Sequence, residues 1–296
     1  MSSLGEIKSH IGAIEQTRQI TNAMYLISAS KMRSTIKKID YNVKYMARLR
    51  STMKDILLHT DDLSGYHFIR RRKESRNVLL ILVTGDKGMC GGYNLNAEAV
   101  FRDAEEKFKS RGVGVRIGAV GIVGEEFLES RNTPPDFRWR GVIQDPTLYS
   151  ARQIASTVIE EYDSGRADEI YMVYTRYRNS AVQTADIMQL LPIELEDYED
   201  VGVEYSERTH MNFEPSPKAV FANLVPQYLI ALIFNMLVQS STGEYAARMN
   251  AMQTSTSNAD EMLSALRSEY NRTRQLDITN EIIEIAATTG TVSDGN

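Results

Sequence analysis

The hydrophobic residues at the start of the chain recur at alternating steps of four and three. This spacing places every stepped position on one stripe of a helix and is typical of a coiled-coil seam. The first 60 residues also contain no proline, so the sequence predicts one long helix over residues 1–60. The stepped positions are Ile7, Ile11, Ile14, Arg18, Thr21, Tyr25, Ser28, Met32, Thr35, Ile39, Asn42, Met46, Leu49, Met53 and Ile56.

The middle of this seam is polar. A stable seam would carry leucine or isoleucine at four stepped positions where this chain has Arg18, Thr21, Ser28 and Thr35. The pattern therefore predicts a helix that packs weakly against its partner in this part.

A second helical segment fills the C-terminal part of the chain. From Lys218 to about Ala287 only one proline and one glycine interrupt it, and four isoleucines fall between residues 278 and 285. Neither terminal helix could bury its apolar stripe alone. We therefore expect the two helices to form an antiparallel coiled coil, with the C-terminal helix and tail occupying residues 208–296.

Between the helices the pattern changes to short apolar runs that alternate with helical stretches. Such alternation predicts βαβ units and a mainly parallel sheet. We expect a Rossmann-like α/β domain over residues 78–207, joined to the first helix by a charged linker at 61–77. The expected fold class is thus α/β, a long coiled coil with this domain inserted. The predicted strands are 77–84, 115–123, 168–176 and 180–191, and the predicted helices between them are 94–110 and 147–163.

Composition and charge exclude several classes of function. The chain is 42% hydrophobic and 25% charged, as globular proteins are. Its four histidines and single cysteine give no metal-ligand spacing, so we expect no metal and no cofactor. The first 60 residues carry ten Lys or Arg against four Asp or Glu. A basic helix can bind nucleic acid, but aromatic stacking residues are sparse there. A solvated face, or one that meets an acidic partner, is the favoured interpretation.

The sequence shows no export signal and no membrane span. Its first residues lack a cationic segment followed by an apolar run. The apolar stretch at 228–238 is shorter than the roughly 20 residues that cross a bilayer. A lone cysteine, Cys90, suits a reducing compartment. We expect a cytoplasmic protein whose contact with a membrane is peripheral.

The glycine-rich loop at 85–94 follows an apolar strand and precedes a helix, where a phosphate-binding loop would lie. Its spacing matches neither GxGxxG nor GxxxxGK[ST], which favours a tight structural turn. The adjacent carboxylates Glu105–Glu106 and Glu125–Glu126 are interpreted as solvated helix faces rather than an acid–base pair. No catalytic residue is proposed.

Three further segments carry a resemblance to a known family. They are Ile20–Arg33 (ITNAMYLISASKMR), Glu244–Met252 (EYAARMNAM) and Tyr270–Ile282 (YNRTRQLDITNEI). Together with the loop at 85–94, and in this order along the chain, they resemble the gamma subunit of the F-type ATP synthase. The sequence departs from the family at Asn22, where a lysine is common.

The resemblance implies a central-stalk rotor subunit that is not itself an enzyme. Such a subunit couples rotation of a membrane c ring, driven by protons or sodium ions, to conformational change at catalytic beta subunits. Its implied partners are the alpha and beta subunits of the hexamer, the epsilon subunit and the c ring. The implied location is the cytoplasmic face of the bacterial plasma membrane, with the mitochondrial matrix and chloroplast stroma as alternatives.

The resemblance also implies contact residues. Met24 would face an acidic lever of a beta subunit, although ordinary seam packing is the alternative for this residue. The expected contacts with the alpha/beta hexamer are Met24, Arg33, Arg248, Gln275, Thr279, Glu281, Ile282 and Ile285. Those with the c ring and epsilon subunit are Lys87, Met89, Phe213 and Glu214.

A different function stays open on the residues alone. A coiled-coil scaffold with a nucleotide-binding α/β domain would have the same element order. Tight nucleotide binding, or stable self-association of the isolated chain, would distinguish it from a rotor.

Overall fold

The computed structural model describes residues 3–58, 67–69, 76–193, 214 and 216–293, without the side chains of 57–58 and 286–293. It divides into two compact units. Residues 1–27 and 249–296 form the first, here called the helical unit, and residues 28–248 form the second, here called the sheet unit. Most of the predicted linker and the segment 194–213 lie outside the described residues.

Both predicted long helices are confirmed. Helix α1 spans Leu4–Leu58, and α5 spans Pro217–Ser293, which is six residues beyond the predicted end at Ala287. Proline suits the first position of α5 because the amide it lacks would have no partner inside the helix. The hydroxyl of Ser216 accepts a hydrogen bond from the Ala219 amide at 3.2 Å and so caps this end.

In the helical unit, α1 and α5 run in opposite directions. Glu15 pairs with Arg267 at 2.6 Å, whereas Thr21, later in α1, meets Thr256, earlier in α5, at 2.8 Å. Ile14 is buried against α5. The seam prediction is wrong for Arg18, whose side chain is 47% exposed and pairs with Asp260 at the surface.

The sheet unit contains five strands in the order β3-β2-β1-β4-β5. The first three pairs in this order are parallel, and β5 is antiparallel to β4. A mainly parallel sheet was expected and is observed. The strands are β1 (Asn77–Val83), β2 (Gly114–Val120), β3 (Phe137–Trp139), β4 (Glu169–Tyr177) and β5 (Gln183–Leu191).

One predicted strand is too long. The strand predicted at 115–123 ends at Val120, because Gly121 has φ +94° and turns the chain into helix α3, Ile122–Ser130. A Cβ at Gly121 would lie 2.3 Å from the carbonyl oxygen of Thr84, so only glycine fits this turn. Neither α3 nor the three-residue β3 was predicted.

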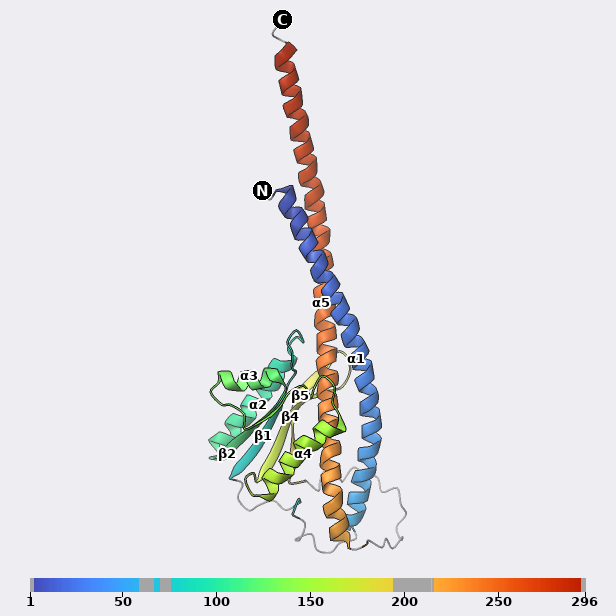
Figure 1. The fold of residues 1–296 in the computed structure, drawn as a ribbon, viewed down its shortest axis with the longest axis vertical. Coiled ribbons are helices and arrows are strands. Elements are labelled where there is room, and N and C mark those ends of the chain that lie inside the picture. The colour runs from blue at the N-terminus through green and yellow to red at the C-terminus, as the bar shows by residue number, and fades with distance from the viewer. Residues whose placement is uncertain (1–2, 59–66, 70–75, 194–213, 215, 294–296) are drawn as a thin grey trace. The chain divides into compact units, whose positions relative to one another are not determined.

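Helices cover both faces of the sheet (Figure 1). Val78, Leu80 and Leu82 of β1 pack toward α2 (Tyr93–Ser110) and α3. The alternate residues of β1 pack toward α4 (Leu148–Asp163) and the parts of α1 and α5 in this unit. The alternation follows from the two-residue period of a strand, and both faces are buried because both carry helices.

Part of α5 is long and apolar enough to cross a membrane, but half of that stretch is buried inside the protein. Leu229, Ile233 and Leu237 are fully buried in the core beneath the sheet. This burial is that of a core helix, which passes the same test of length and composition.

The interpretation of two glutamates as solvated is wrong. Glu105 and Glu125 are 1% and 3% exposed. Each carboxylate is shared by two basic side chains, Glu105 by Lys109 and Arg131. Arg138 and Arg140 bind Glu125 at 2.8 and 2.7 Å. Adjacent carboxylates in a sequence therefore do not lie equally on a helix surface: one of each pair points inward, where it needs cationic partners.

Candidate partner-contact surfaces

The polar positions of α1 are buried at a strict seven-residue spacing. Thr21 lies in the helical unit, and Ser28, Thr35 and Asn42 lie in the sheet unit; each is less than 9% exposed. Asn42 donates its amide to the carbonyl of Ala231 at 2.9 Å, and Thr35 donates to a carbonyl of its own helix. These bonds give Asn42 and Thr35 hydrogen-bond partners but bury little apolar area. The helix pairing in this part is therefore specific without being strongly apolar.

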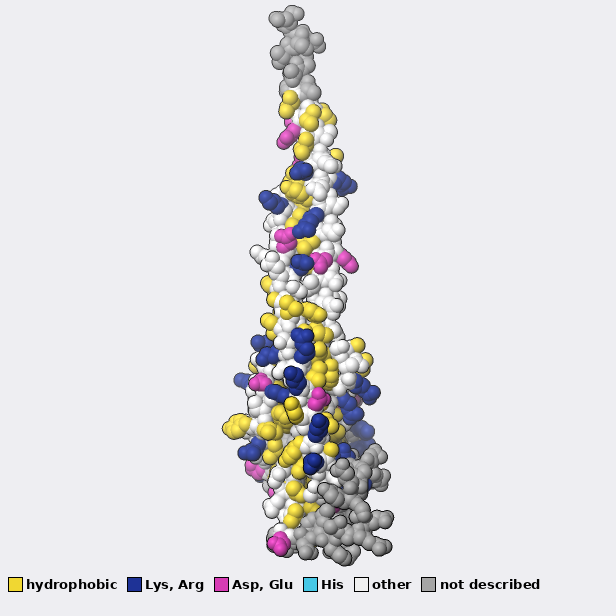
Figure 2. Space-filling model, turned by 90° about the vertical axis from the view of Figure 1, so that its right-hand side faces the viewer, with side chains coloured by type: hydrophobic (Ala, Val, Ile, Leu, Met, Phe, Trp, Pro, Cys, Tyr) yellow, Lys and Arg dark blue, Asp and Glu magenta, His cyan; other side chains and the backbone are white. Residues whose placement is uncertain are grey.

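The predicted contact residues of α1 lie in different units. Met24 is half-buried in the helical unit, and Arg33 is exposed in the sheet unit. Figure 2 shows further Lys and Arg side chains along α1. A row of cations at this density would attract an acidic partner. The exposed basic residues of α1 in the sheet unit are Lys31, Arg33, Lys37, Lys44 and Arg48.

The end of α5 presents a continuous exposed surface. Every described side chain from Arg274 to Ile285 is exposed. Hydrophobic side chains are plain in this part of α5 in Figure 2. Large apolar side chains so exposed mark an interaction site or an aggregation hazard. The predicted contacts Gln275, Thr279, Glu281, Ile282 and Ile285 all lie on this surface. The exposed fractions of its apolar residues are Leu276 51%, Ile278 45%, Ile282 61%, Ile283 59% and Ile285 65%.

The glycine-rich loop lies against α5 within the sheet unit. The guanidinium of Arg248 donates from Nη2 to the carbonyls of Lys87 and Gly88, at 3.3 and 3.1 Å. The same nitrogen donates to Oε1 of Glu244 at 2.6 Å, one helical turn away on α5. Gly85 approaches this carboxylate so closely that a Cβ there would lie 2.9 Å from Oε1. Close contact with the Glu244 side chain on α5 therefore favours glycine at position 85.

Side chains of α5 occupy the carboxyl edge of strands β1 and β4. The hydroxyl of Ser240 accepts a hydrogen bond from the amide of Thr175 in β4 at 3.0 Å, and Glu244 lies against Gly85 after β1. Ligands of open α/β sheets bind at this edge, where the strand order reverses. In this protein the edge is filled by the chain itself.

Burial controls the titration of this region. It raises the pKa of the Glu244 carboxyl, against the lowering effect of Arg248, with Asp86 raising it further. Burial likewise raises the pKa of the Cys90 thiol. A thiol of raised pKa is a poor nucleophile at neutral pH. Among the described residues no group of His, Cys, Asp and Glu could hold a metal ion. The loop at 85–94, Glu244 and Arg248 thus form a structural contact between the sheet and α5.

The structure brings together only some of the predicted residues. Lys87 and Met89 are exposed at the tip of the loop that Arg248 binds, while Arg248 itself is only 9% exposed. Arg248 thus has an intramolecular role, and its contact with a partner stays a prediction. Glu214 is exposed, and Phe213 lies outside the described residues. The sequence analysis missed Glu244, although the spacing Glu-x-x-x-Arg on a helix was a signal for an ion pair.

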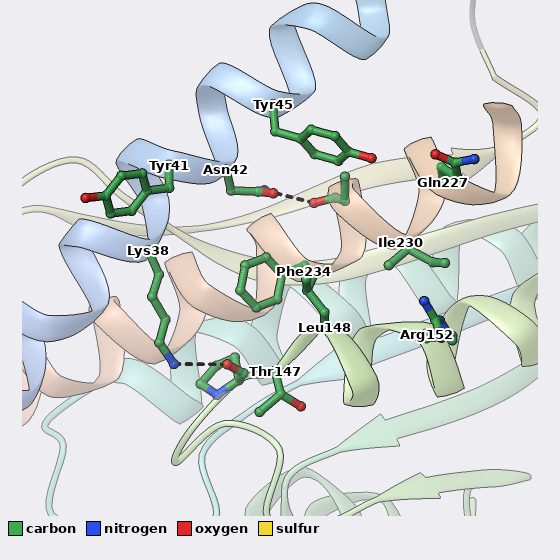
Figure 3. Close-up of a pocket in the computed structure, with 12 residues that line it drawn as sticks. Lys38, Tyr41, Asn42, Tyr45, Thr147, Leu148, Arg152, Gln227, Ile230 and Phe234 are labelled. Atoms are coloured by element: carbon green, nitrogen blue, oxygen red, sulfur yellow. Dashed lines mark hydrogen bonds between the residues drawn. The ribbon is translucent and has the colours of Figure 1, made fainter.

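A cavity of about 820 Å³ opens between α1, α4 and α5 in the sheet unit (Figure 3). Tyr41 and Tyr45 of α1 and Phe234 of α5 supply aromatic walls. Lys38 closes one end, where its Nζ donates to Asp145 Oδ1 at 2.7 Å and to the Pro146 carbonyl at 3.1 Å. The lining comes from three distant segments, and no motif in the sequence marked it.

Comparison with known proteins gives a consistent result. The family model described as ATP synthase matches residues 3–291. The chain is 37% identical to the ATP synthase gamma chain of Caldanaerobacter subterraneus subsp. tengcongensis, over 95% of this chain and 97% of the relative. It is 35% identical to that of Ruminiclostridium cellulolyticum, over 96% and 97%.

Solved structures show the same fold. A chain of the Euglena gracilis mitochondrial ATP synthase matches with a TM-score of 0.67 at 17% identity, over 99% of this chain and 95% of that one. A chain from the central stalk and c ring of the Tetrahymena thermophila mitochondrial ATP synthase matches with a TM-score of 0.56 at 22% identity, over 79% and 98%.

Proposed function

The chain belongs to the family of ATP synthase gamma chains, and on this premise we propose that it is the central rotor shaft of an F-type ATP synthase. It couples rotation of a membrane c ring to conformational change at catalytic beta subunits. The coupling ion is a proton or sodium ion. The chain carries no catalytic site of its own.

The exposed end of α5 is the observation that carries this proposal. Helix α1 begins at Leu4, and Glu15, close to this start, pairs with Arg267 of α5. The side chains from Arg274 to Ile285 then have no cover from α1 or any other described segment. An apolar helix end of this kind needs a partner, and the collar of an alpha/beta hexamer would supply one.

The finer architecture follows from the same contacts. We interpret the antiparallel pair of α1 and α5 as a coiled coil and the sheet unit as a Rossmann-like α/β domain inserted in it. The proposed segments are 1–60, 61–77, 78–207 and 208–296. A rotor must bias partner domains that have two states without binding any one of them too tightly. The polar positions at Thr21, Ser28 and Thr35 suit this requirement.

The proposed contacts extend along the whole chain. Met24 and Arg33, with the residues of α5 from Gln275 to Ile285, would meet the alpha/beta hexamer. Lys87 and Met89 would lie near the epsilon subunit and c ring. The complex would lie on the cytoplasmic face of a bacterial plasma membrane. A nucleotide-binding scaffold is not favoured, because Ser240 and Glu244 fill the edge of the sheet where a nucleotide would bind.

Purification of complexes through a tag on this chain tests the proposal. We expect alpha, beta, epsilon and c subunits to be recovered together, with ATP hydrolysis in the complex and none in the isolated chain. Recovery of the chain alone, or as a stable assembly of its own copies, would contradict the rotor function.

A further inference from the structure

We propose that Glu244 and Arg248 form a latch that fixes the loop 85–90 against α5 and so holds Lys87 and Met89 in one exposed conformation. Arg248 is then a positioning residue that acts through the loop. The latch is a property of this chain alone. Its consequence for a partner rests on the proposed function.

One guanidinium nitrogen makes the latch: its two hydrogens serve three acceptors, so that one of the hydrogens is shared between two oxygens. Nη2 of Arg248 binds Glu244 on its own helix and the carbonyls of Lys87 and Gly88 on the loop. The side chains of Arg248 and Glu244 are only 10% and 4% exposed. Hydrogen bonds from a charged donor are stronger than neutral ones, and screening by water is weak at this burial. The carboxylate orients the guanidinium toward the loop.

The loop is held at two further places. Oδ1 of Asp86 accepts the amide of Gly141 at 3.0 Å, and Oδ1 of Asn94 on α2 accepts the amide of Gly85 at 2.9 Å. Both bonds hold the start of the loop, at Gly85 and Asp86, and neither involves residues 87–89. In the middle, the carbonyl of Gly88 accepts from Arg248, and that of Lys87 accepts from Arg248 and from the Cys90 thiol, whose Sγ lies 3.8 Å away.

Met89 shows why the middle needs a latch. Its φ is +59°, and its side chain is 64% exposed. A residue with a Cβ adopts this left-handed conformation at a cost, and the conformation persists only where surrounding contacts impose it. The exposed methionine side chain does not anchor it. The adjacent carbonyls of Lys87 and Gly88, held by Arg248, do.

A fixed loop has a direct consequence for binding. A partner that meets Lys87 and Met89 does not have to order the loop first, so less conformational entropy is lost on contact. Under the proposed function, α5 and the loop would then present one rigid surface to the neighbouring subunit.

Cys90 provides a reporter for the latch. It is the only cysteine of the chain, lies at the end of the loop and is 2% exposed. In the full-length chain we expect Arg248→Ala and Glu244→Gln to speed the reaction of Cys90 with Ellman's reagent about tenfold or more, through local opening. Arg248→Lys keeps the charge but replaces the planar guanidinium with an ammonium group of different reach and geometry, and we expect an intermediate rate. The matched control is Arg176→Ala, which breaks a surface pair with Asp186 in the same unit.

Hydrogen exchange separates local opening from loss of the fold. We expect exchange in Arg248→Ala to rise at residues 85–92 and to stay unchanged in β1 at 77–83. Protection of Cys90 and of the loop equal to wild type in both Arg248→Ala and Glu244→Gln would overturn the latch, and so would equal acceleration in Arg176→Ala. The proposed function is judged separately by subunit recovery through a tag, which can fail while Cys90 remains protected.

Discussion

Removal of the end of α5 separates the stability of the chain from that of its assembly. We consider truncation after Asp277, which deletes residues 278–296. The four isoleucines between 278 and 285 are 45–65% exposed, so they contribute little to folding of the isolated chain. We expect the free energy of unfolding to change by less than about 0.5 kcal/mol, as for other surface changes.

The cost of the truncation should appear in the complex. Full burial of an isoleucine contributes roughly 1.5 to 3 kcal/mol, and about half of each side chain is still available to a partner. Four such side chains would contribute about 3 to 6 kcal/mol to assembly, more than a hundredfold in the equilibrium constant. The exposure of these side chains in the isolated chain confines the expected loss to assembly.

Two measurements check this prediction. Denaturant unfolding of the isolated chain gives its stability, and subunit recovery through a tag gives assembly. Leu263→Ala is the matched control, because Leu263 is 4% exposed and packs with Ile14 and Ala259, so it should cost about 2 to 5 kcal/mol of stability. We expect the few truncated complexes that form to rotate still in a single-molecule assay. A chain destabilised as much as the control, or complexes formed at the full-length yield, would refute the reasoning.

Three other predictions follow from particular residues. Met24→Lys should slow coupling of ATP hydrolysis to ion pumping with assembly intact; wild-type coupling would mean that Met24 only packs in the seam. A surface ion pair is worth about 0 to 1 kcal/mol, so a severe effect needs the partial burial that Met24 has. The isolated chain should not bind ATP in equilibrium dialysis, and a Kd near or below about 1 μM would contradict the filled edge at Glu244. For Glu125, a hydrogen bond from Arg140 lowers the pKa, so its stabilisation exists above the unfolded pKa and is lost as pH falls through the folded one. Glu125→Gln should lower the free energy of unfolding by about 1 kcal/mol near neutral pH, a limited amount because the two arginines are partly exposed. Wild type and variant should become equally stable in acid, and a difference in stability that persists there would count against the pairing.

The sequence predicted those elements whose pattern is set by local burial. Strand β1 was found to within a residue because it is buried on both faces, which leaves a continuous apolar run. The predicted start of α4 at Thr147 coincides with its N-cap, where the structure shows a capping box with Ser150. Helix α3 was missed because Ile122 and Val123 continue an apolar run, and only the backbone angle of Gly121 ends the strand.

The candidate contact residues show the same limit of what a sequence predicts. A resemblance carries over the position of a residue but not the state of its side chain. Gln275 and Ile282 are exposed, as a contact requires, whereas Arg248 is turned inward to the carbonyls of the loop. That orientation depends on residues 160 positions away along the chain, and no local pattern encodes it.

The seven-residue spacing of Thr21, Ser28, Thr35 and Asn42 connects the fold to the proposed function. A coiled coil that only had to be stable would bury leucine or isoleucine at these positions. Here the buried groups are polar, and several are satisfied by carbonyls of the helices themselves, as Thr35 and Asn42 are. Such bonds fix the register of two helices without a wide apolar face that would also attract a partner. The strongly apolar contacts lie elsewhere, in the core beneath the sheet and at the exposed end of α5. The buried polar groups thus hold the two helices in register, while the outer side of α1 nearby exposes the apolar Ile20, Leu26 and Ile27 at 58–60%, so a passing partner would meet apolar as well as basic side chains there.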